Sequence, residues 1–209
     1  MIRTKLLKGQ THRSAPTLYL HRRIIMKKCY LGLLIACMAM VTFYCDLMSG
    51  KMIELKHYPI DDLKGLAPQT VGEYLNNVSS SGKIEFDKSV SSDGKGSIKI
   101  IINNATKINL FETGKIDIEN ARLVYQAKVK TEEISGQVYL EMWCVVNGQS
   151  YFSRGLKKIL TGTVDWTTLE TPFLFKKGET PDNIKLGLVI NATGTVWVDD
   201  IRLLKEPLE

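Results

Sequence analysis

Aromatic and acidic side chains alternate with apolar ones between residues 137 and 146. Every second residue there is apolar, which is the pattern of a strand that lines a core on one face. The opposite face carries Tyr139, Glu141 and Trp143. Flat aromatic rings pack against the apolar faces of sugar rings, and carboxylates accept hydrogen bonds from hydroxyl groups. These residue types, at this spacing, would suit recognition of a polyhydroxylated ligand.

The turn that follows predicts which other residues join this face. Asn147-Gly148 favours a tight hairpin. A two-residue loop would pair Trp143 with Phe152 and Glu141 with Arg154, and a four-residue loop would shift the partners by two positions on the same face. The preceding strand adds Gln126 if its apolar residues face the core. The candidate ligand-binding residues are therefore Tyr139, Glu141, Trp143, Phe152, Arg154 and Gln126.

A purely structural role is the alternative for these side chains. The aromatic residues could form ordinary cross-strand pairs, or lie beneath the irregular segment 61–77, the least strand-like part of the domain. Glu141 and Arg154 would then form a surface ion pair, which contributes little to stability. Whether this face is open or covered separates a ligand-binding module from a structural or protein-interaction domain.

The sequence argues against an enzyme. It contains no P-loop, no dinucleotide-binding fingerprint and no zinc-ligand spacing. Beyond residue 28 the one histidine is His57, and no nucleophile motif accompanies it. A glycosidase needs two carboxylates that face each other across a cleft, and the spacing of Glu112, Glu141 and Asp165 selects no such pair. We therefore expect a protein without catalytic activity.

The positive charge is concentrated at the beginning of the chain. The 209 residues include 28 Lys and Arg and 22 Asp and Glu, a net charge of +6. Residues 1–28 hold eight of the basic residues and no acid, so the rest has 20 basic and 22 acidic residues, or −2. Nucleic-acid binding needs a basic stripe on the folded domain, so we expect no nucleic-acid partner.

A basic leader followed by a short apolar run is the pattern of an export signal. Residues 29–45 contain no charge, and Met26-Lys-Lys before them could be the true start of translation. The run is at the lower length limit for a membrane span, and the positive charges before it would hold its amino end in the cytoplasm. We therefore expect an exported, membrane-associated protein of the cell envelope, with residues 46–52 as a tether.

Three fates of the apolar run stay open. Leu34-Ile-Ala-Cys37 resembles a bacterial lipoprotein box, in which Cys37 would become the lipidated first residue after cleavage. The run could instead remain as an uncleaved anchor, or be cleaved elsewhere. Beyond it lies a single cysteine, Cys144, on an apolar strand face, so we expect neither an internal disulfide nor a thiolate metal cluster in the domain.

From Ser79 onward, short runs of alternating apolar residues recur between turns rich in Gly, Asn, Asp and Ser. This spacing, without a long amphipathic helix, is typical of an antiparallel sandwich or barrel. A weaker strand over residues 52–60 would precede them. The further predicted strands are Lys83–Phe86, Ser97–Ile102, Lys107–Phe111, Ala121–Lys130, Gln137–Val146, Tyr151–Leu156, Thr167–Phe175, Asn183–Ile190 and Thr195–Leu204.

Four motifs follow one another in a recognisable order. They are a Gly-Lys turn before a strand (Ser92–Ile100), an Asp-Trp turn (Gly162–Thr168), an apolar strand (Ile184–Ile190) and a Val-Trp strand with an Asp-Asp pair (Gly194–Leu204). This succession resembles the galactose-binding-like jelly rolls found among carbohydrate-binding modules. The resemblance implies an all-β fold, an antiparallel β-sandwich over residues 53–207. The pair Ala121–Tyr125 and Tyr139–Cys144 also resembles strands of a group of bacterial exported proteins.

The resemblance carries expectations about ligands as well as fold. Such modules often bind glycans on a sheet face, so we expect a glycan or an envelope protein as the partner. An acid of their closing strand often helps to hold a structural calcium ion, and oxygen ligands suit calcium. Asp199 and Asp200 match that position, with Glu54 and Asp93 as candidate partner ligands; the alternative is a bulge with solvated acids. We expect no other cofactor.

Overall fold

The computed structural model describes residues 51–70 and 81–208. The basic leader, the apolar run with Cys37 and most of the tether lie outside these residues, so the predictions of export, lipidation and anchoring stay predictions. Among the residues that are described, no helical segment has the length and apolarity that a membrane span requires.

Strands dominate the described residues, and every strand pairing is antiparallel. In chain order they are β1 (Ile53–Tyr58), the single helical turn α2 (Pro68–Thr70), β2 (Gly82–Asp87), β3 (Ser97–Ile102), β4 (Thr106–Gly114), β5 (Ala121–Val146), β6 (Gln149–Arg154), β7 (Leu160–Phe175), β8 (Asn183–Asn191) and β9 (Gly194–Pro207). The predicted all-β class is confirmed.

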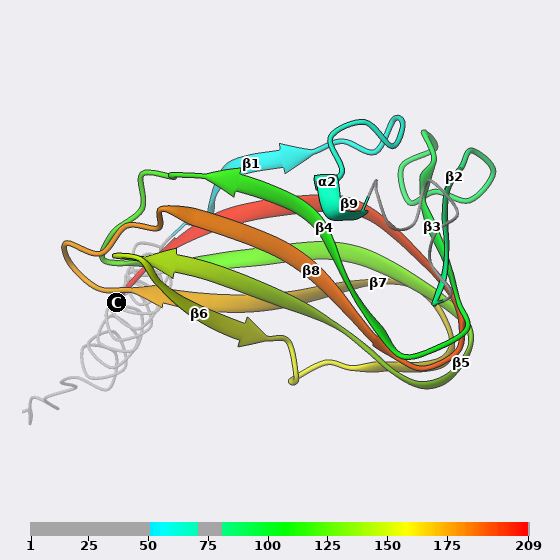
Figure 1. Cartoon of the computed structure of the whole chain (residues 1–209). Coiled ribbons are helices and arrows are strands. Elements are labelled where there is room, and N and C mark those ends of the chain that lie inside the picture. Colours follow the sequence, from blue (N-terminus) through cyan, green and yellow to red (C-terminus); the bar gives the residue numbers. More distant parts are fainter. Residues whose placement is uncertain (1–50, 71–80, 209) are drawn as a thin grey trace, which may run out of the picture. The chain divides into compact units, whose positions relative to one another are not determined.

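One long strand, β5, joins the two layers of the sandwich (Figure 1). Its first half pairs with β7 and β9, and its second half pairs with β6 and β8. Between the halves the register with β7 shifts three times, from Val129 to Val138, and Glu133 has a φ of 53°. Such bulges bend a strand, so the sheet folds back on itself. The sequence predicted two separate strands here, because the linking residues are polar.

The core lies between the two halves of β5 and their neighbours. In both halves alternate side chains are fully buried, and burying one large apolar side chain contributes roughly 1.5–3 kcal/mol. These side chains are Leu123, Tyr125, Ala127 and Val129 in the first half and Val138, Leu140, Met142 and Cys144 in the second. Burial raises the pKa of the Cys144 thiol to about 12, which agrees with its predicted role as a small core residue.

The closing strand, β9, contains a bulge at Asp199-Asp200. Val198 and Ile201 both point into the core, although three positions separate them instead of two. Asp200 has a φ of 50°, and the register with β5 shifts at this place. A bulge adds one residue to a strand, and this one lets the apolar alternation resume at Ile201. The sequence predicted this interruption.

The described part of the irregular segment, residues 61–70, runs along the free edge of β4. The Ala67 amide donates to the Leu110 carbonyl at 2.9 Å, and the Thr70 hydroxyl donates to the Asn109 carbonyl at 2.5 Å. Leu66 joins the core. This segment therefore covers the unpaired edge of β4; residues 71–77 of the predicted lid lie outside the described residues.

Candidate functional site

The hairpin between β5 and β6 has the register that a two-residue loop predicts. Asn147 and Gly148 have φ values of 51° and 73°, as a type I′ turn requires. Trp143 pairs with Phe152, and their ring centroids lie 5.1 Å apart at an interplanar angle of 37°. Glu141 pairs with Arg154. Four of the predicted site residues thus lie side by side on two strands.

Glu141 is the buried centre of this group. Its side chain is 1% exposed, and its Oε2 accepts a hydrogen bond from Arg154 Nε at 2.7 Å. Its Oε1 accepts from Trp143 Nε1 at 2.5 Å and also forms an ion pair with Lys107. Burial alone would raise the pKa of Glu141, but the hydrogen bonds from Lys107, Arg154 and Trp143 outweigh it and hold that pKa below its ordinary value.

The prediction that Glu141 and Arg154 form an ion pair on the surface was therefore only partly right. The two residues do interact, but the carboxylate is buried and has three donors instead of one. The third donor, Lys107, comes from β4, which lies two strands away across β8. Sequence reasoning missed Lys107 because strand order cannot be derived from alternation within one strand.

Cations also flank the two aromatic rings. Lys107 Nζ lies 4.4 Å from the centroid of the Trp143 ring, and Arg154 Cζ lies 4.7 Å from that of Phe152. Each contact is worth roughly 0.5–1 kcal/mol at an exposed site. Because Lys107 and Arg154 both bind Glu141 as well, the carboxylate fixes the positions of both rings. The aromatic pair is thus preorganised.

Two predicted residues do not contribute an open surface to this face. Tyr139 lies on it but is only 6% exposed, so its ring is not free to stack on a ligand. Gln126 lies in the first half of β5, where it pairs with Glu170 and Arg202. The outward side chains of the two layers point away from a shared core, so Gln126 and Trp143 lie on opposite surfaces. The prediction for Gln126 was wrong because β5 bends between them.

A cavity of about 360 Å³ opens beside Trp143 on the outer face of the β4–β8–β5–β6 layer. In its middle, Gly187 of β8 pairs with Glu141 on one side and Asn109 on the other. Glycine inside a strand often marks a place where a ligand or another backbone approaches closely; a Cβ at Gly187 would lie 3.2 Å from the Ile108 carbonyl oxygen. The lining residues of this Trp143 cavity are Lys107, Asn109, Trp143, Val145, Ser150, Asn183, Lys185 and Gly187.

Asn109 brings an unpaired amide to this cavity. Its Nδ2 and Oδ1 are both buried, and neither has a hydrogen-bond partner. Leaving a buried polar group unpaired costs about 1–3 kcal/mol, so such a group in a folded protein calls for an explanation. The amide offers one donating and one accepting atom. Because neither atom is exposed to solvent, two hydroxyl groups of a ligand would satisfy both only after a small movement of the cavity wall.

Asp199 does not have the surroundings of a calcium ligand. It is buried, and its Oδ2 accepts hydrogen bonds from the amide and the hydroxyl of Ser92 at 2.8 and 2.7 Å. Its Oδ1 accepts from the amide of Asp200 at 2.8 Å. Both oxygens are thus occupied by donors that tie the 91–95 loop to the bulge of β9.

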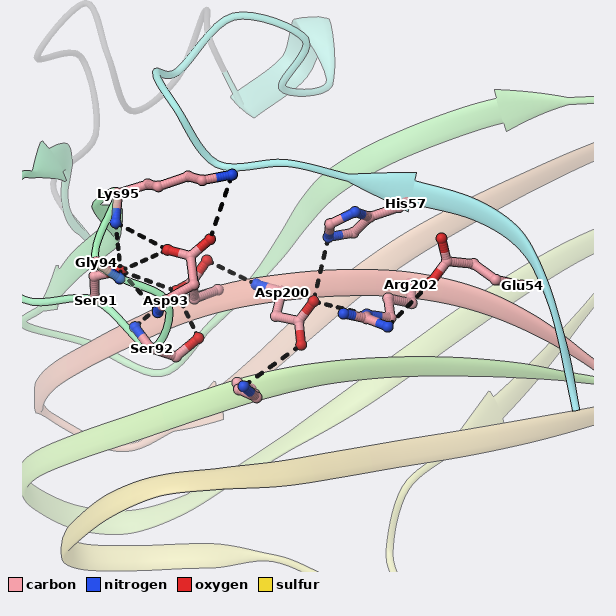
Figure 2. Close-up of polar contacts among 11 residues, drawn as sticks. Glu54, His57, Ser91, Ser92, Asp93, Gly94, Lys95, Asp200 and Arg202 are labelled. Carbon is pink, nitrogen blue, oxygen red and sulfur yellow. Dashed lines mark hydrogen bonds and ion pairs between the residues drawn. The ribbon is translucent and has the colours of Figure 1, made fainter.

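Asp200 faces basic side chains instead of further carboxylates. Its carboxylate lies 2.7 Å from Arg202 Nε, 3.2 Å from His57 Nε2 and 3.6 Å from Lys128 Nζ. Figure 2 shows that Glu54 contacts Arg202. The Arg202 Nη1 atom lies 3.1 Å from Glu54 Oε2. In residues 51–70 and 81–208 no group of three His, Cys, Asp or Glu could hold a metal ion. These residues do not fit the calcium ion that the resemblance implied.

The predicted partner ligand Asp93 serves its own loop. Its carboxylate accepts hydrogen bonds from the Ser91 hydroxyl and the Lys95 amide, both at 2.9 Å, as Figure 2 shows. The Lys95 hydrogen bond, followed by that from Ser91, holds the pKa of Asp93 below its ordinary value. The carboxylate of Asp93 therefore organises the turn of its own loop, and the carboxylate of Asp199 organises the bulge of β9.

No protein-family model and no curated protein sequence matches this chain. Among solved structures it is similar to the CBM22-1–GH10 modules of Clostridium thermocellum endo-1,4-β-D-xylanase 10B complexed with xylohexaose. That similarity has a TM-score of 0.52 at 15% identity, over 75% of this chain and 29% of that chain. The fold is a jelly roll of the carbohydrate-binding-module type.

Two further solved structures resemble the chain more weakly. The CBM22-1 xylan-binding domain of Paenibacillus barcinonensis Xyn10C has 11% identity and a TM-score of 0.42, over 63% of this chain and 85% of that chain. A family 16 carbohydrate-binding module has 13% identity and a TM-score of 0.43, over 67% and 96%. At such identities the likeness concerns the fold alone, and it identifies neither a ligand nor a site residue.

Proposed function

We propose that this domain is a non-catalytic module that binds a glycan in the Trp143 cavity. The observation that carries the proposal is the unpaired, buried amide of Asn109, which lies in the wall of a cavity beside an aromatic pair. A sugar offers what this place lacks, namely adjacent hydroxyl groups for the amide and an apolar ring face for the aromatic side chains.

The size and lining of the cavity support a small polar ligand. Its volume of about 360 Å³ lies within the range of roughly 300–1,000 Å³ that is usual for ligand sites. Ser150 and Asn183 add hydroxyl and amide groups, and Phe152 beside the cavity wall is 51% exposed. The similarity of the fold to carbohydrate-binding modules supports the same class of ligand.

The chemistry of Glu141 supports binding over catalysis. A glycosidase acid must carry a proton near neutral pH, which requires a raised pKa. The pKa of Glu141 is lowered instead, and three donors occupy its oxygens. Glu141 therefore acts as a fixed anion that positions Trp143, Lys107 and Arg154.

The proposal extends to the location of the protein. The basic leader and apolar run of residues 1–45 support an exported domain of the cell envelope, lipidated on Cys37 or retained by an uncleaved anchor. The module would then hold glycans close to the membrane surface.

A structural or protein-interaction domain is the second candidate. It is favoured by Tyr151 and Phe152 of β6, which are 50% and 51% exposed. Edge strands with exposed apolar side chains are common places for another chain to add. In this alternative the cavity would have no small-molecule ligand.

A glycan array with the full-length protein distinguishes the two candidates. We expect binding by the wild type, loss of binding in Trp143→Ala, and unchanged binding in Trp166→Ala, a matched tryptophan that does not line the cavity. A folded wild type that binds no glycan, or Trp143→Ala that binds like the wild type, would refute the proposed function.

A further inference from the structure

The charged side chains that line the Trp143 cavity all have the same sign. Lys107 and Lys185 line it, and no aspartate or glutamate does so among the described residues. This is not the consequence of a basic domain, because residues 29–209 carry 20 basic and 22 acidic side chains. The positive charge is specific to this place.

The two lysines approach the cavity from opposite ends. Lys107 of β4 pairs with Val189 of β8, and Lys185 lies four residues before Val189 on the same strand. Four residues of an antiparallel strand span about 13 Å, and Gly187 lies midway between. Both lysine side chains reach solvent, with exposed fractions of 44% and 40%. Each ammonium group is therefore accessible to a ligand that lies over Gly187.

Neighbouring carboxylates leave this positive charge incompletely balanced. The buried Glu141 is shared between Lys107 and Arg154. Among the described residues, Lys185 forms an ion pair only with Glu112, at 3.9 Å, and the same oxygen of Glu112 accepts a hydrogen bond from Asn183. Lys107, Lys185 and Arg154 thus share two carboxylates, although Arg154 does not line the cavity, and neither carboxylate belongs to that lining. A neutral sugar would leave the excess positive charge without a partner.

We infer that the ligand of the Trp143 cavity is an acidic glycan, an oligosaccharide with a uronic acid whose carboxylate binds Lys185 or Lys107. This inference rests on the proposed function and specifies the chemical class of the ligand. Hydrogen bonds between ammonium and carboxylate groups are roughly twice as strong as neutral ones. The aromatic pair and the Asn109 amide bind the sugar ring, and the lysines select its charge.

The direct test compares an oligogalacturonate with its carboxyl-reduced form, which keeps the sugar ring and loses the charge. Calorimetric titration of the full-length protein should show affinity for the acidic form that is higher by about tenfold or more. The preference should shrink as the salt concentration rises, because both lysines are partly exposed.

Variants assign the preference to a residue. Lys185→Gln should lose most of the preference for the acidic form. Lys157→Gln, which removes an exposed lysine outside this cavity, should keep the full preference. Circular dichroism would verify that both variants are folded.

The outcomes distinguish a failure of the acidic-glycan inference from a failure of the proposed glycan-binding function. Equal affinity for the acidic and reduced forms would overturn the acidic-glycan inference and leave the proposed function standing. Full preference in Lys185→Gln and in Lys107→Gln would also overturn it, because the charge would then be recognised elsewhere. Failure to bind either of these forms and every neutral glycan on the array would overturn the proposed function itself.

Discussion

At the scale of single residues, the site depends on a buried carboxylate whose charge is used to hold other side chains. Glu141 receives hydrogen bonds from Trp143 and Arg154 and an ion pair from Lys107. A buried ion is tolerated only when such partners compensate its loss of hydration. The acid that the sequence indicated as a candidate ligand-binding residue is therefore buried and holds the side chains around it.

Replacing Glu141 by glutamine should destabilise the domain and disorder the aromatic pair. The amide would direct hydrogens toward two cations, and we expect a loss of about 1–3 kcal/mol in the free energy of unfolding. Urea denaturation measures this change. Glu170→Gln, at an exposed glutamate of β7, is the control; an equally small effect in both variants would contradict the account.

Asp87 should make stability depend on acid pH. Hydrogen bonds from Ser89 and Trp197 lower the pKa of this carboxyl from 3.8 to about 2. The unfolded chain then binds the proton more readily than the folded one, so the contribution to stability is present above pH 4 and lost as pH falls toward 2. Denaturation of the wild type and Asp87→Asn at several pH values should show a shallower pH dependence in the variant across this window.

At the scale of elements, the hairpin register is what places Phe152 opposite Trp143. Gly148 has a φ of 73°, and a Cβ added there would meet no atom within 4 Å. The cost of Gly148→Ala is therefore conformational alone, about 1 kcal/mol. Thermal denaturation should show this small loss, with glycan binding preserved. A much larger loss, or loss of binding, would mean that the turn does more than set the register.

The strands themselves could be predicted well, because alternation and turn residues are local signals. Ser97–Ile102 agrees residue for residue with β3, and the pairing of Trp143 with Phe152 follows from Asn147-Gly148. The bend in β5 could not be predicted, because Glu133 and its polar neighbours lack a pattern that distinguishes a turn from a bulged strand. The error for Gln126 follows directly from that bend.

The cavity could not be predicted from the sequence, because its residues meet only through the order of the strands in the sheet. Lys107, Asn109 and Gly187 lie on β4 and β8, far from Trp143 in the chain, and they meet it only because β8 inserts between β4 and β5. Such long-range strand order is set by the packing of the whole core and not by any local motif. The pairing of Trp143 with Phe152 was therefore predictable, whereas the positions of Lys107, Asn109 and Gly187 beside Trp143 were not.

At the scale of the whole molecule, hydrogen bonds and ion pairs engage the closing-strand carboxylates for which the resemblance implied calcium. Ser92 and the cations around Asp200 occupy the carboxylates of the closing strand. The domain should therefore show the same Tm with added calcium and with excess chelator. Differential scanning calorimetry checks this, and a Tm that rises with calcium would contradict the assignment.

The most direct test of the central claim is a paired measurement on Asn109→Ala. If the unpaired amide exists to bind a sugar, its removal should lower the affinity for the best glycan on the array by about tenfold or more. The free energy of unfolding should stay equal or rise, because a buried polar group without a partner is removed. Unchanged affinity together with a folded variant would contradict the claim that the Trp143 cavity is the glycan site.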